Sequence, residues 1–347
     1  MTVKIGINGL GRIGRMVVRA IIENKYKNIE IKHINNRSSS EVSASLLKYD
    51  SVHGQFKSKV NFDKNNIILN GKKITFTQET DIQKINWKKS NIDVVLECTG
   101  KFNSKDKLLP HLRNGAKKVI VSAPCKNSDK TIVYGVNENT ITKKDRIISA
   151  ASCTTNCLAP VVKTLNDKFE IEKGFMTTIH AFTSDQRILD NSHKDPRRAR
   201  SASQSIVPTS TGASKAIGEI IPSLKGKLKG IAMRVPTPNV SLIELVFCTN
   251  KEISKEKIND VFKDVSKNQS KKIWSGYRTG KPSSSSLMAT RQAVRQLKRQ
   301  PVSFLLAKLR SLISRATKTL QRLVKTTTFR RFVRLFGMHN RSGRMES

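Results

Sequence analysis

Acidic residues are scarce in this chain. Its 347 residues include 26 Asp and Glu against 65 Lys and Arg, which gives a formal net charge of +39 at pH 7. Part of the imbalance is local, because Glu346 is the single acidic residue of residues 274–347. An excess of positive charge favours contacts with anions and says nothing about the fold.

Long apolar runs and a regular cysteine framework are also lacking. No run of apolar residues reaches the roughly 18 that a membrane span requires, and the N-terminal MTVKIGING does not have the form of a secretory signal. The five cysteines are an odd number and lack the regular spacing of a disulfide framework. We therefore expect reduced thiols, a cytoplasmic location and no membrane partner. The apolar content of 37% still allows a chain of this length to bury a core.

The glycines near the N-terminus stand in a pattern typical of dinucleotide binding. Alternating apolar residues predict a strand before them, and RMVVRAIIE predicts a helix after them. A G-x-G-x-x-G motif between a strand and a helix lets the backbone approach a pyrophosphate at the N-terminus of that helix. An ordinary tight turn is the alternative. The candidate cofactor contacts are Gly9, Gly11, Arg12, Ile13 and Gly14.

The second predicted strand, IEIKHIN, ends where an acidic residue usually binds the ribose of NAD. This chain has Asn36 there, followed by Arg37. A carboxylate would repel the 2′-phosphate of NADP, whereas Asn36 would not, and Arg37 is able to pair with it. The predicted cofactor is therefore NAD, NADP or both, with Asn36 among its contacts.

Three further apolar segments, at residues 93–100, 117–124 and 146–152, predict additional strands. Strands that alternate with helical or turn segments indicate a parallel, doubly wound α/β sheet. Ligands of such sheets bind outside the carboxyl ends of the strands. The residues at these ends are candidate cofactor contacts, unless they serve only as turn residues: Thr99, Gly100 and Ser122.

A cysteine stands where a helix is predicted to begin. The segment SAASCTTNCLAP places Cys153 after a strand and at the N-terminus of a helix over residues 153–169. The positive end of a helix and its free N–H groups favour a thiolate, which is the effective nucleophile. The same N–H groups are able to hold an oxyanion. Cys157, one turn further on, is predicted to be buried and inert.

A cysteine nucleophile needs a base, and GFMTTIHAFT places His180 at the end of a predicted strand. A lone histidine in a strand is more often a packing residue. Together with a nucleotide domain and a helix-capping cysteine, however, it fits one chemistry. The thiolate attacks an aldehyde, hydride passes to a nicotinamide, and the resulting thioester is released to a nucleophile such as phosphate. We therefore interpret Cys153 and His180 as a catalytic pair.

Nine segments occur in an order that carries a resemblance to a known family. They are INGLGRIGR, KYDSVHGQF, ECTG, VSAP, SCTTNC, TIHAFT, DPRRAR, VPTSTGASKA and MRVPTPNVS. Over residues 1 to about 273, the chain resembles phosphorylating glyceraldehyde-3-phosphate dehydrogenase of the glycolytic type. The resemblance implies oxidation of glyceraldehyde 3-phosphate, with NAD(P) and phosphate, to 1,3-bisphosphoglycerate. It also implies a Rossmann domain over residues 1–152 and an α+β catalytic domain with a mixed sheet, incomplete at its C-terminus, over residues 153–273.

The same resemblance implies roles for individual residues and no metal. Cys153 would be the nucleophile, and His180 its activator and proton carrier. Two phosphate sites require hydroxyls, backbone N–H groups and guanidinium groups. The implied contacts of the attacking phosphate are Ser152, Thr154, Thr211 and Gly212, and those of the substrate's own phosphate are Thr183, Arg198 and Arg234. A plain surface charge is the alternative for Arg198. A homotetramer is also implied, with residues 182–207 beside the cofactor of a neighbouring subunit.

Three positions depart from the family pattern. Asn36 replaces the usual ribose-binding acid, and Ser192 stands where members that prefer NAD often have proline. Serine there resembles the photosynthetic relatives that use NADP. Thr80 replaces an arginine near the adenine. The first two departures predict tolerance of NADP, and the third weakens the expected adenine contacts.

The largest departure is the C-terminal segment. Residues 274–347 lack the SWYDNEWG-like motif, whose Asn fixes the nicotinamide amide in the family, and the strands and final helix around it. Leucines at helical spacing over residues 303–324, with Arg and Lys between them, predict a basic amphipathic helix. We favour a reading-frame shift near codon 273 as the origin of this tail.

Two other functions stay open at this level. A paralogue that acts on erythrose 4-phosphate would share the cysteine–histidine pair. An inactive chain with a basic tail that binds nucleic acid or a membrane surface would keep the site residues without turnover. Nucleic acid is therefore an expected partner only if the tail is functional.

Overall fold

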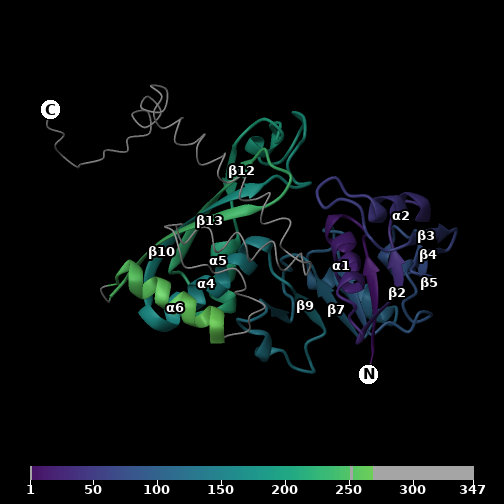
Figure 1. Ribbon diagram of the computed structural model, residues 1–347, viewed down its shortest axis with the longest axis horizontal. Helices are drawn as coiled ribbons and strands as arrows, with labels where there is room; N and C mark the ends of the chain where they lie inside the picture. The colour runs from purple at the N-terminus through teal and green to yellow at the C-terminus, as the bar shows by residue number, and fades with distance from the viewer. Residues whose placement is uncertain (1, 251–252, 269–347) are drawn as a thin grey trace. The chain divides into compact units, whose positions relative to one another are not determined.

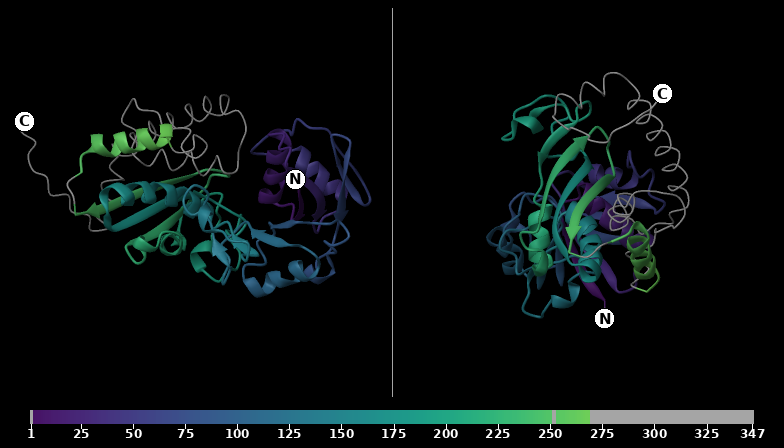
Figure 2. Two further views of the ribbon diagram at one scale, coloured as in Figure 1. Left: turned by 90° about the horizontal axis from the view of Figure 1, so that it is seen from below. Right: turned by 90° about the vertical axis from the view of Figure 1, so that its left-hand side faces the viewer.

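The computed structural model describes residues 2–250 and 253–268 of the chain. The helix expected over residues 303–324 lies outside the described residues, as does the rest of the segment 274–347. The arrangement of helices and strands can be followed in Figures 1 and 2.

The N-terminal part is built on a nine-stranded sheet with β1 (Val3–Asn8) inside it. The strand β1 pairs in parallel with β2 (Ile29–Asn35) on one side and with β6 (Val94–Glu97) on the other. The parallel sheet continues on the side of β6 with β7 (Lys118–Val121), β9 (Ile147–Ser149) and β8 (Lys130–Thr131). Its helices are α1 (Arg12–Glu23), α2 (Ser40–Lys48) and α3 (Lys105–Arg113), with short 3₁₀ turns at Ile82–Lys84 and Glu138–Thr140.

The strands predicted from the sequence pair in parallel, but one edge of the sheet carries an antiparallel hairpin that was not predicted. The strand β5 (Lys72–Thr77) pairs in parallel with β2, but β4 (Asn66–Leu69) and β3 (Val60–Asp63) continue from it as antiparallel strands. The two residues between β4 and β5 are Asn70 and Gly71, both with positive φ. An Asn-Gly pair of this conformation is the typical connection of a two-residue β-hairpin, so the signal was present in the sequence.

The second part is built on a four-stranded sheet in the order β11-β12-β10-β13. Its strands β10 (Ile171–Ala181) and β12 (Leu228–Val235) are parallel to each other. The strands β13 (Ser241–Thr249) and β11 (Val207–Ser210) pair antiparallel with β10 and β12 respectively. The sheet is mixed, as the sequence predicts. The helices are α4 (Cys153–Phe169), α5 (Ala213–Ile220) and α6 (Lys255–Asn268), with 3₁₀ turns at Pro196–Ala199 and Pro222–Leu224.

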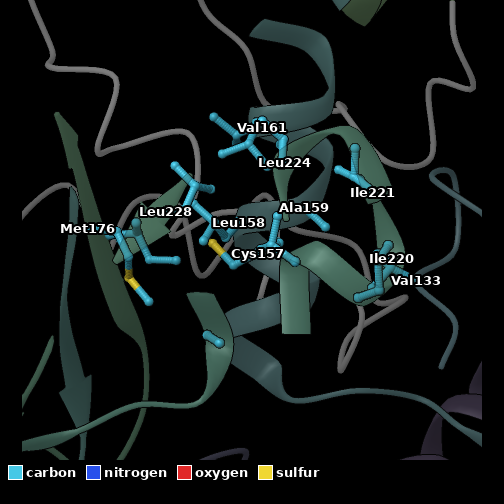
Figure 3. Close-up of a cluster of buried hydrophobic side chains, with 14 of the residues drawn as sticks. Val133, Cys157, Leu158, Ala159, Val161, Met176, Ile220, Ile221, Leu224 and Leu228 are labelled. Carbon is cyan, nitrogen blue, oxygen red and sulfur yellow. The ribbon is translucent and has the colours of Figure 1, made fainter. Parts of the chain in front are cut away.

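The core of this part lies between the helices and one face of the sheet. Figure 3 shows buried side chains of α4, among them Leu158 and Val161, together with Met176 of β10 and Leu228 of β12. Cys157 is 1% exposed within this cluster, as predicted for an inert residue. Burial of the middle of α4 holds its first residue, Cys153, in a defined place.

The opposite face of the four-stranded sheet carries exposed apolar side chains. Along β10, Met176 and Thr178 are buried, whereas Phe175 and Ile179 are exposed. Successive side chains of a strand point to opposite faces, so this alternation separates a core face from an open face. Val246 of β13 is 64% exposed and adds to the apolar residues on the surface.

Candidate active site

Cys153 is the first residue of α4, as the sequence predicts. Ser152 caps the helix, because its hydroxyl oxygen accepts a hydrogen bond of 3.0 Å from the backbone N–H of Thr155. Ala151, just before the cap, has a φ of 56°, which is unusual for a residue other than glycine. Strained backbone of this kind is often found at functional sites. Here it accompanies the sharp turn from β9 into the helix that carries the thiol.

The structure brings His180 to this thiol. The Sγ atom of Cys153 lies 3.1 Å from Nε2 of His180, at the carboxyl end of β10. The other ring nitrogen, Nδ1, lies 2.7 Å from the carbonyl oxygen of Ala181. Nδ1 also lies 2.6 Å from Nη1 of Arg234, which only donates, so it faces both an acceptor and a donor. In the tautomer that donates from Nδ1 to the carbonyl, Nε2 is able to take the proton of the thiol. The geometry is that of a nucleophile and its base.

The surroundings of Cys153 favour its thiolate. Burial by itself raises the pKa of the thiol, but the hydrogen bond to His180, the charges of His180 and Arg234, and the N–H of Thr154 together lower it to about 7. By contrast, burial raises the pKa of Cys98 to about 12. Cys153 also keeps solvent-exposed surface, which a nucleophile needs for access to its substrate.

Arg234 adds positive charge beside Cys153 and His180. It lies on β12 directly opposite His180 in the register of the sheet. Its Nη1 donates a hydrogen bond of 3.0 Å to the carbonyl oxygen of Ala181 and lies 2.6 Å from Nδ1 of His180. The Nε of Arg234 is buried and has no hydrogen-bond partner within the described part of the chain. A buried donor without a partner fits an anionic group of a bound substrate.

Arg198 is held at the same site by acidic and hydroxyl partners. It forms an ion pair with Asp185, and its Nε donates a hydrogen bond of 2.8 Å to Oγ1 of Thr209. Burial lowers the pKa of Arg234 most, the charge of Cys153 opposes this, and the charge of Arg198 lowers it further. Arg198 and Cys153 are therefore both within electrostatic reach of Arg234. A cluster of two guanidinium groups next to a nucleophile is suited to a phosphorylated substrate.

The remaining predicted phosphate contacts stand at two helix ends and one loop. Thr211 and Gly212 precede the first residue of α5, and the Thr211 hydroxyl accepts from the N–H of Ala213 at 3.2 Å. Thr154 is 7% exposed in the first turn of α4. Thr183 uses its N–H and its hydroxyl to hold the side-chain oxygen of Gln186, at 2.8 and 3.0 Å. The predicted phosphate-binding roles of these residues stay predictions.

The glycine turn between β1 and α1 has the geometry that the motif predicts. Gly9 has a φ of 92°, a conformation that favours glycine. A side-chain carbon on Gly14 would lie 2.1 Å from the carbonyl oxygen of Gly9, so the third glycine is needed for the turn to pack on the helix. A carbon on Gly11 would meet nothing within 4 Å. The open space and the N–H groups at the start of α1, which has no side-chain cap, fit a pyrophosphate.

Asn36, a predicted cofactor contact, lies beside this turn, and its side chain forms hydrogen bonds within the protein. Its Oδ1 accepts from the N–H of Leu10 at 3.2 Å, and its Nδ2 donates to the hydroxyl of Ser43 at 3.0 Å. Arg37 is exposed next to it. Arg12, at the start of α1, forms an ion pair of 2.6 Å with the buried Asp50. An amide at position 36 carries no charge to repel a 2′-phosphate, so this corner is compatible with one.

The loop after β6 holds the other predicted cofactor contacts. Thr99 is packed against the glycine turn, because a side-chain carbon on Gly9 would lie 2.8 Å from the Thr99 backbone nitrogen. Gly100 follows with a φ of 72°. Ser122, at the end of β7, donates its backbone N–H to the carbonyl oxygen of Glu97 at 3.0 Å. Thr99 and Gly100 thus follow the carboxyl end of β6, and Ser122 follows that of β7.

Two acidic residues of the nucleotide part were not predicted from the sequence. Asp50 anchors Arg12, and Glu97 is 1% exposed at the carboxyl end of β6. A carboxylate in the otherwise apolar run DVVLECTG was the available signal for Glu97, because charged residues are seldom fully buried without partners. Neither a helix that could cross a membrane nor a cluster of metal ligands occurs in residues 2–250 and 253–268.

Comparisons with known proteins agree with this architecture. The NAD-binding domain of glyceraldehyde 3-phosphate dehydrogenase matches residues 3–105, and the C-terminal domain of the same enzyme matches residues 152–300. The chain is 51% identical over 269 residues to glyceraldehyde-3-phosphate dehydrogenase 2 of Bacillus subtilis, a match that covers 77% of this chain and 78% of the relative. It is 50% identical over 274 residues to glyceraldehyde-3-phosphate dehydrogenase of Geobacillus stearothermophilus, with 79% and 81% covered. The chain therefore belongs to the glyceraldehyde-3-phosphate dehydrogenase family.

Proposed function

We propose that this protein oxidises D-glyceraldehyde 3-phosphate, with NAD(P) and inorganic phosphate, to 1,3-bisphosphoglycerate. The observation that carries the proposal is the 3.1 Å contact between Cys153 Sγ and His180 Nε2 at the N-terminus of α4. Family membership and the names of the 50% identical relatives give the reaction class.

The first step uses the thiolate of Cys153. It attacks the aldehyde carbon, the C–S bond forms, and the oxygen that becomes negative is stabilised by positive charge at the site. His180 takes the thiol proton through Nε2 and, as an imidazolium held by the Ala181 carbonyl, returns a proton to the hemithioacetal oxygen. The product of this step is a hemithioacetal on Cys153.

The second step converts the hemithioacetal to a thioester. The nicotinamide, when bound, supplies the chemistry of hydride acceptance from the former aldehyde carbon. His180 removes the hydroxyl proton as the hydride leaves, so the carbonyl of the thioester forms. Inorganic phosphate then attacks this carbonyl, the C–S bond breaks, and the thiolate of Cys153 is restored, which its pKa of about 7 makes an adequate leaving group.

Two anion sites support this sequence of steps. We assign the substrate's own phosphate to Thr183, Arg198 and Arg234, because the two guanidinium groups act on one another electrostatically and Arg234 keeps a buried donor without a partner in the described residues. We assign the attacking phosphate to Ser152, Thr154, Thr211 and Gly212, which stand at the positive ends of α4 and α5.

The cofactor and the assembly are proposed on separate grounds. Asn36 and Arg37 in place of an acid support use of both NAD and NADP. The open apolar face of the four-stranded sheet, with Phe175 and Val246 exposed, supports a homotetramer in which such faces are covered. Five free cysteines support a cytoplasmic location.

The domain boundaries also stay a proposal. We place the nucleotide domain at residues 1–152, the catalytic domain at 153–273 and an unrelated tail at 274–347. Alignments with the curated relatives that span 259 to 274 residues support the second boundary. The C-terminal family model, which reaches residue 300, counts against it.

The test is a rate measurement on the purified chain. Reduction of NAD and of NADP is followed with glyceraldehyde 3-phosphate and with erythrose 4-phosphate, in the presence and absence of phosphate. We expect the highest kcat/KM with glyceraldehyde 3-phosphate, dependence on phosphate, and loss of turnover in Cys153→Ser. A preference for erythrose 4-phosphate would replace the proposed substrate with its rival.

A further inference from the structure

The carboxylate of Glu97 is fully enclosed and accepts from four donors. Its Oε2 accepts from Nδ2 of Asn8 at 2.7 Å and from Nε2 of His111 at 3.1 Å. Its Oε1 accepts from the backbone N–H of Thr99 at 2.7 Å and from the Thr99 hydroxyl. Glu97, Asn8 and His111 are 1%, 2% and 0% exposed. Four donors fill the capacity of an ionised carboxylate, which offers no donor of its own.

A tryptophan fixes the proton on His111. The indole Nε1 of Trp87 donates to Nδ1 of His111 at 2.8 Å, and an indole nitrogen only donates. Nδ1 therefore carries no proton, so the proton resides on Nε2 and points at Glu97. His111 is consequently a neutral donor, and Glu97 is a buried anion held by hydrogen bonds from neutral groups.

The direction of donation continues from Glu97 to the neighbouring strands. Because Asn8 gives its amide N–H to Glu97, its Oδ1 is left to accept, and it accepts from Nδ2 of Asn35 at 2.9 Å. Asn35 also donates to the Glu79 carbonyl oxygen at 2.9 Å, and its Oδ1 accepts from the Glu79 N–H at 2.9 Å. Reversing any one amide would leave a buried donor facing a donor.

This chain of bonds joins the strand ends that surround the nucleotide site. Asn8 ends β1, Asn35 ends β2, Glu97 ends β6, and Glu79 follows β5. At its β6 end, the network holds Thr99, whose backbone lies against the glycine turn at Gly9. Hydrogen-bonded networks in a buried setting are rigid when every member is satisfied.

We infer that Glu97 is a positioning residue of the dinucleotide site: as an acceptor-only hub, it sets the donor direction of the network and thereby holds the Thr99–Gly100 loop and the glycine turn in their binding geometry. The inference rests on the proposed binding of a dinucleotide. It concerns a residue that contacts other protein groups and takes no part in the chemistry at Cys153.

The substitution Glu97→Gln keeps the shape of the side chain but replaces one oxygen, which accepts hydrogen bonds, with an NH₂ group, which donates them. The glutamine oxygen can still accept from Thr99, but its NH₂ then faces Asn8 Nδ2 and His111 Nε2, which are both donors. His111 cannot exchange its tautomer, because Trp87 occupies Nδ1. We expect the Kd of NAD, measured by calorimetry on the full chain, to rise roughly tenfold, with kcat at saturating cofactor changed much less.

A second substitution distinguishes the effect of a changed donor–acceptor order from the effect of changed packing. In the double variant Asn8→Asp/Glu97→Gln the carboxylate and the amide exchange places. The new carboxylate on β1 then accepts from the new amide on β6, and it still accepts from Asn35. The bond between positions 8 and 97 regains one donor and one acceptor, while the bonds to Asn35 and Thr99 are kept and Nε2 of His111 still faces an NH₂ group. Part of the lost affinity should therefore return. If Glu97 had only a structural role, the second substitution would weaken NAD binding further.

Leu69→Ala, in the core at β4, is the control that lowers stability and leaves the donor–acceptor order of the network unchanged. It removes buried apolar contacts and leaves every hydrogen bond of the network in place. We therefore expect it to lower the denaturation midpoint while the Kd of NAD stays within about twofold of the original.

A spectroscopic readout follows the network without cofactor. The chain has two tryptophans, Trp87 and Trp274. In a Trp274→Phe background the emission of Trp87 should shift in Glu97→Gln and return toward the original in the double variant. Unchanged emission, an unchanged Kd in Glu97→Gln, or a double variant that binds no better than the single one would overturn the inference. Failure of the original chain to bind NAD, with the emission shift intact, would contradict the proposed function instead.

Discussion

The sulfur of Cys153 lies 3.1 Å from Nε2 of His180, although 27 residues of sequence separate the two. One residue begins a helix and the other lies near the end of a strand, and both elements contribute to the core of the second part of the chain. The contact lowers the pKa of the thiol, against the effect of burial. It therefore determines how the protein should respond to alkylation, pH and substitution at either residue.

Cys153 should be alkylated by iodoacetamide before any other cysteine. Its pKa is lowered to about 7, so the thiolate appears, and the alkylation rate rises, through that pH and not near the ordinary thiol value. His180→Gln removes the hydrogen bond and the charge that lower this pKa, so the rate at pH 7 should fall roughly tenfold. Peptide mapping after a timed reaction measures both effects.

Cys98→Ser is the control for this labelling experiment. Burial raises the pKa of Cys98 to about 12, so its removal should leave the rate at neutral pH unchanged. Faster labelling of Cys125 or Cys248 than of Cys153 would argue against the assigned nucleophile.

Asn36→Asp should shift cofactor choice toward NAD. The backbone N–H of Leu10 can donate to a carboxylate as it does to the amide oxygen, and the Ser43 hydroxyl can turn to donate as well, so the local fold is retained. The new charge would repel a 2′-phosphate by on the order of a few kcal/mol before screening. The measurement is the ratio of kcat/KM for NADP and NAD, with NAD as the internal reference. An unchanged ratio would contradict the placement of Asn36 at the ribose.

Gly14→Ala should destabilise the nucleotide domain. The added methyl group would lie 2.1 Å from the Gly9 carbonyl oxygen, a backbone atom that cannot move aside cheaply. We expect a loss of about 1–3 kcal/mol in the free energy of unfolding. Gly11→Ala is the matched control for stability, since its methyl group would meet nothing within 4 Å and the residue has a φ of −71°. Urea denaturation compares the two, and equal midpoints would be evidence against the tight turn.

Replacement of the tail should raise activity. Residues 274–347 lack the Asn-containing motif that orients the nicotinamide in the family, and small misplacements of reacting atoms cost large factors in rate. A chimera of residues 1–273 with the C-terminal segment of the Geobacillus stearothermophilus relative should therefore turn over faster and remain more soluble than the chain as written. Equal rates would mean that the tail is a working replacement and would contradict a reading-frame shift. The coding DNA past codon 273, read in another frame, provides an independent check.

Local sequence signals were sufficient for much of the fold. The helix from Cys153 to Phe169 begins and ends where its spacing predicts, and the glycine motif lies between a strand and a helix. Both depend on interactions within a few residues: a cap at Ser152, a positive φ at Gly9, and apolar side chains repeated along one helix face. The Asn70–Gly71 hairpin between β4 and β5 is equally local in the sequence and was not predicted.

By itself, the sequence determined the family, the helix that begins at Cys153 and the residue types of the candidate site, because motifs of neighbouring residues encode them. Only the tertiary structure decided which charges meet. Arg234 reaches His180 across a parallel strand pair, and Arg198 contacts Asp185 and Thr209 through a folded loop. The donor–acceptor order of the buried network around Glu97 depends in turn on four strand ends that are distant in sequence. Such contacts arise from the pairing and packing of whole elements, which no local pattern specifies.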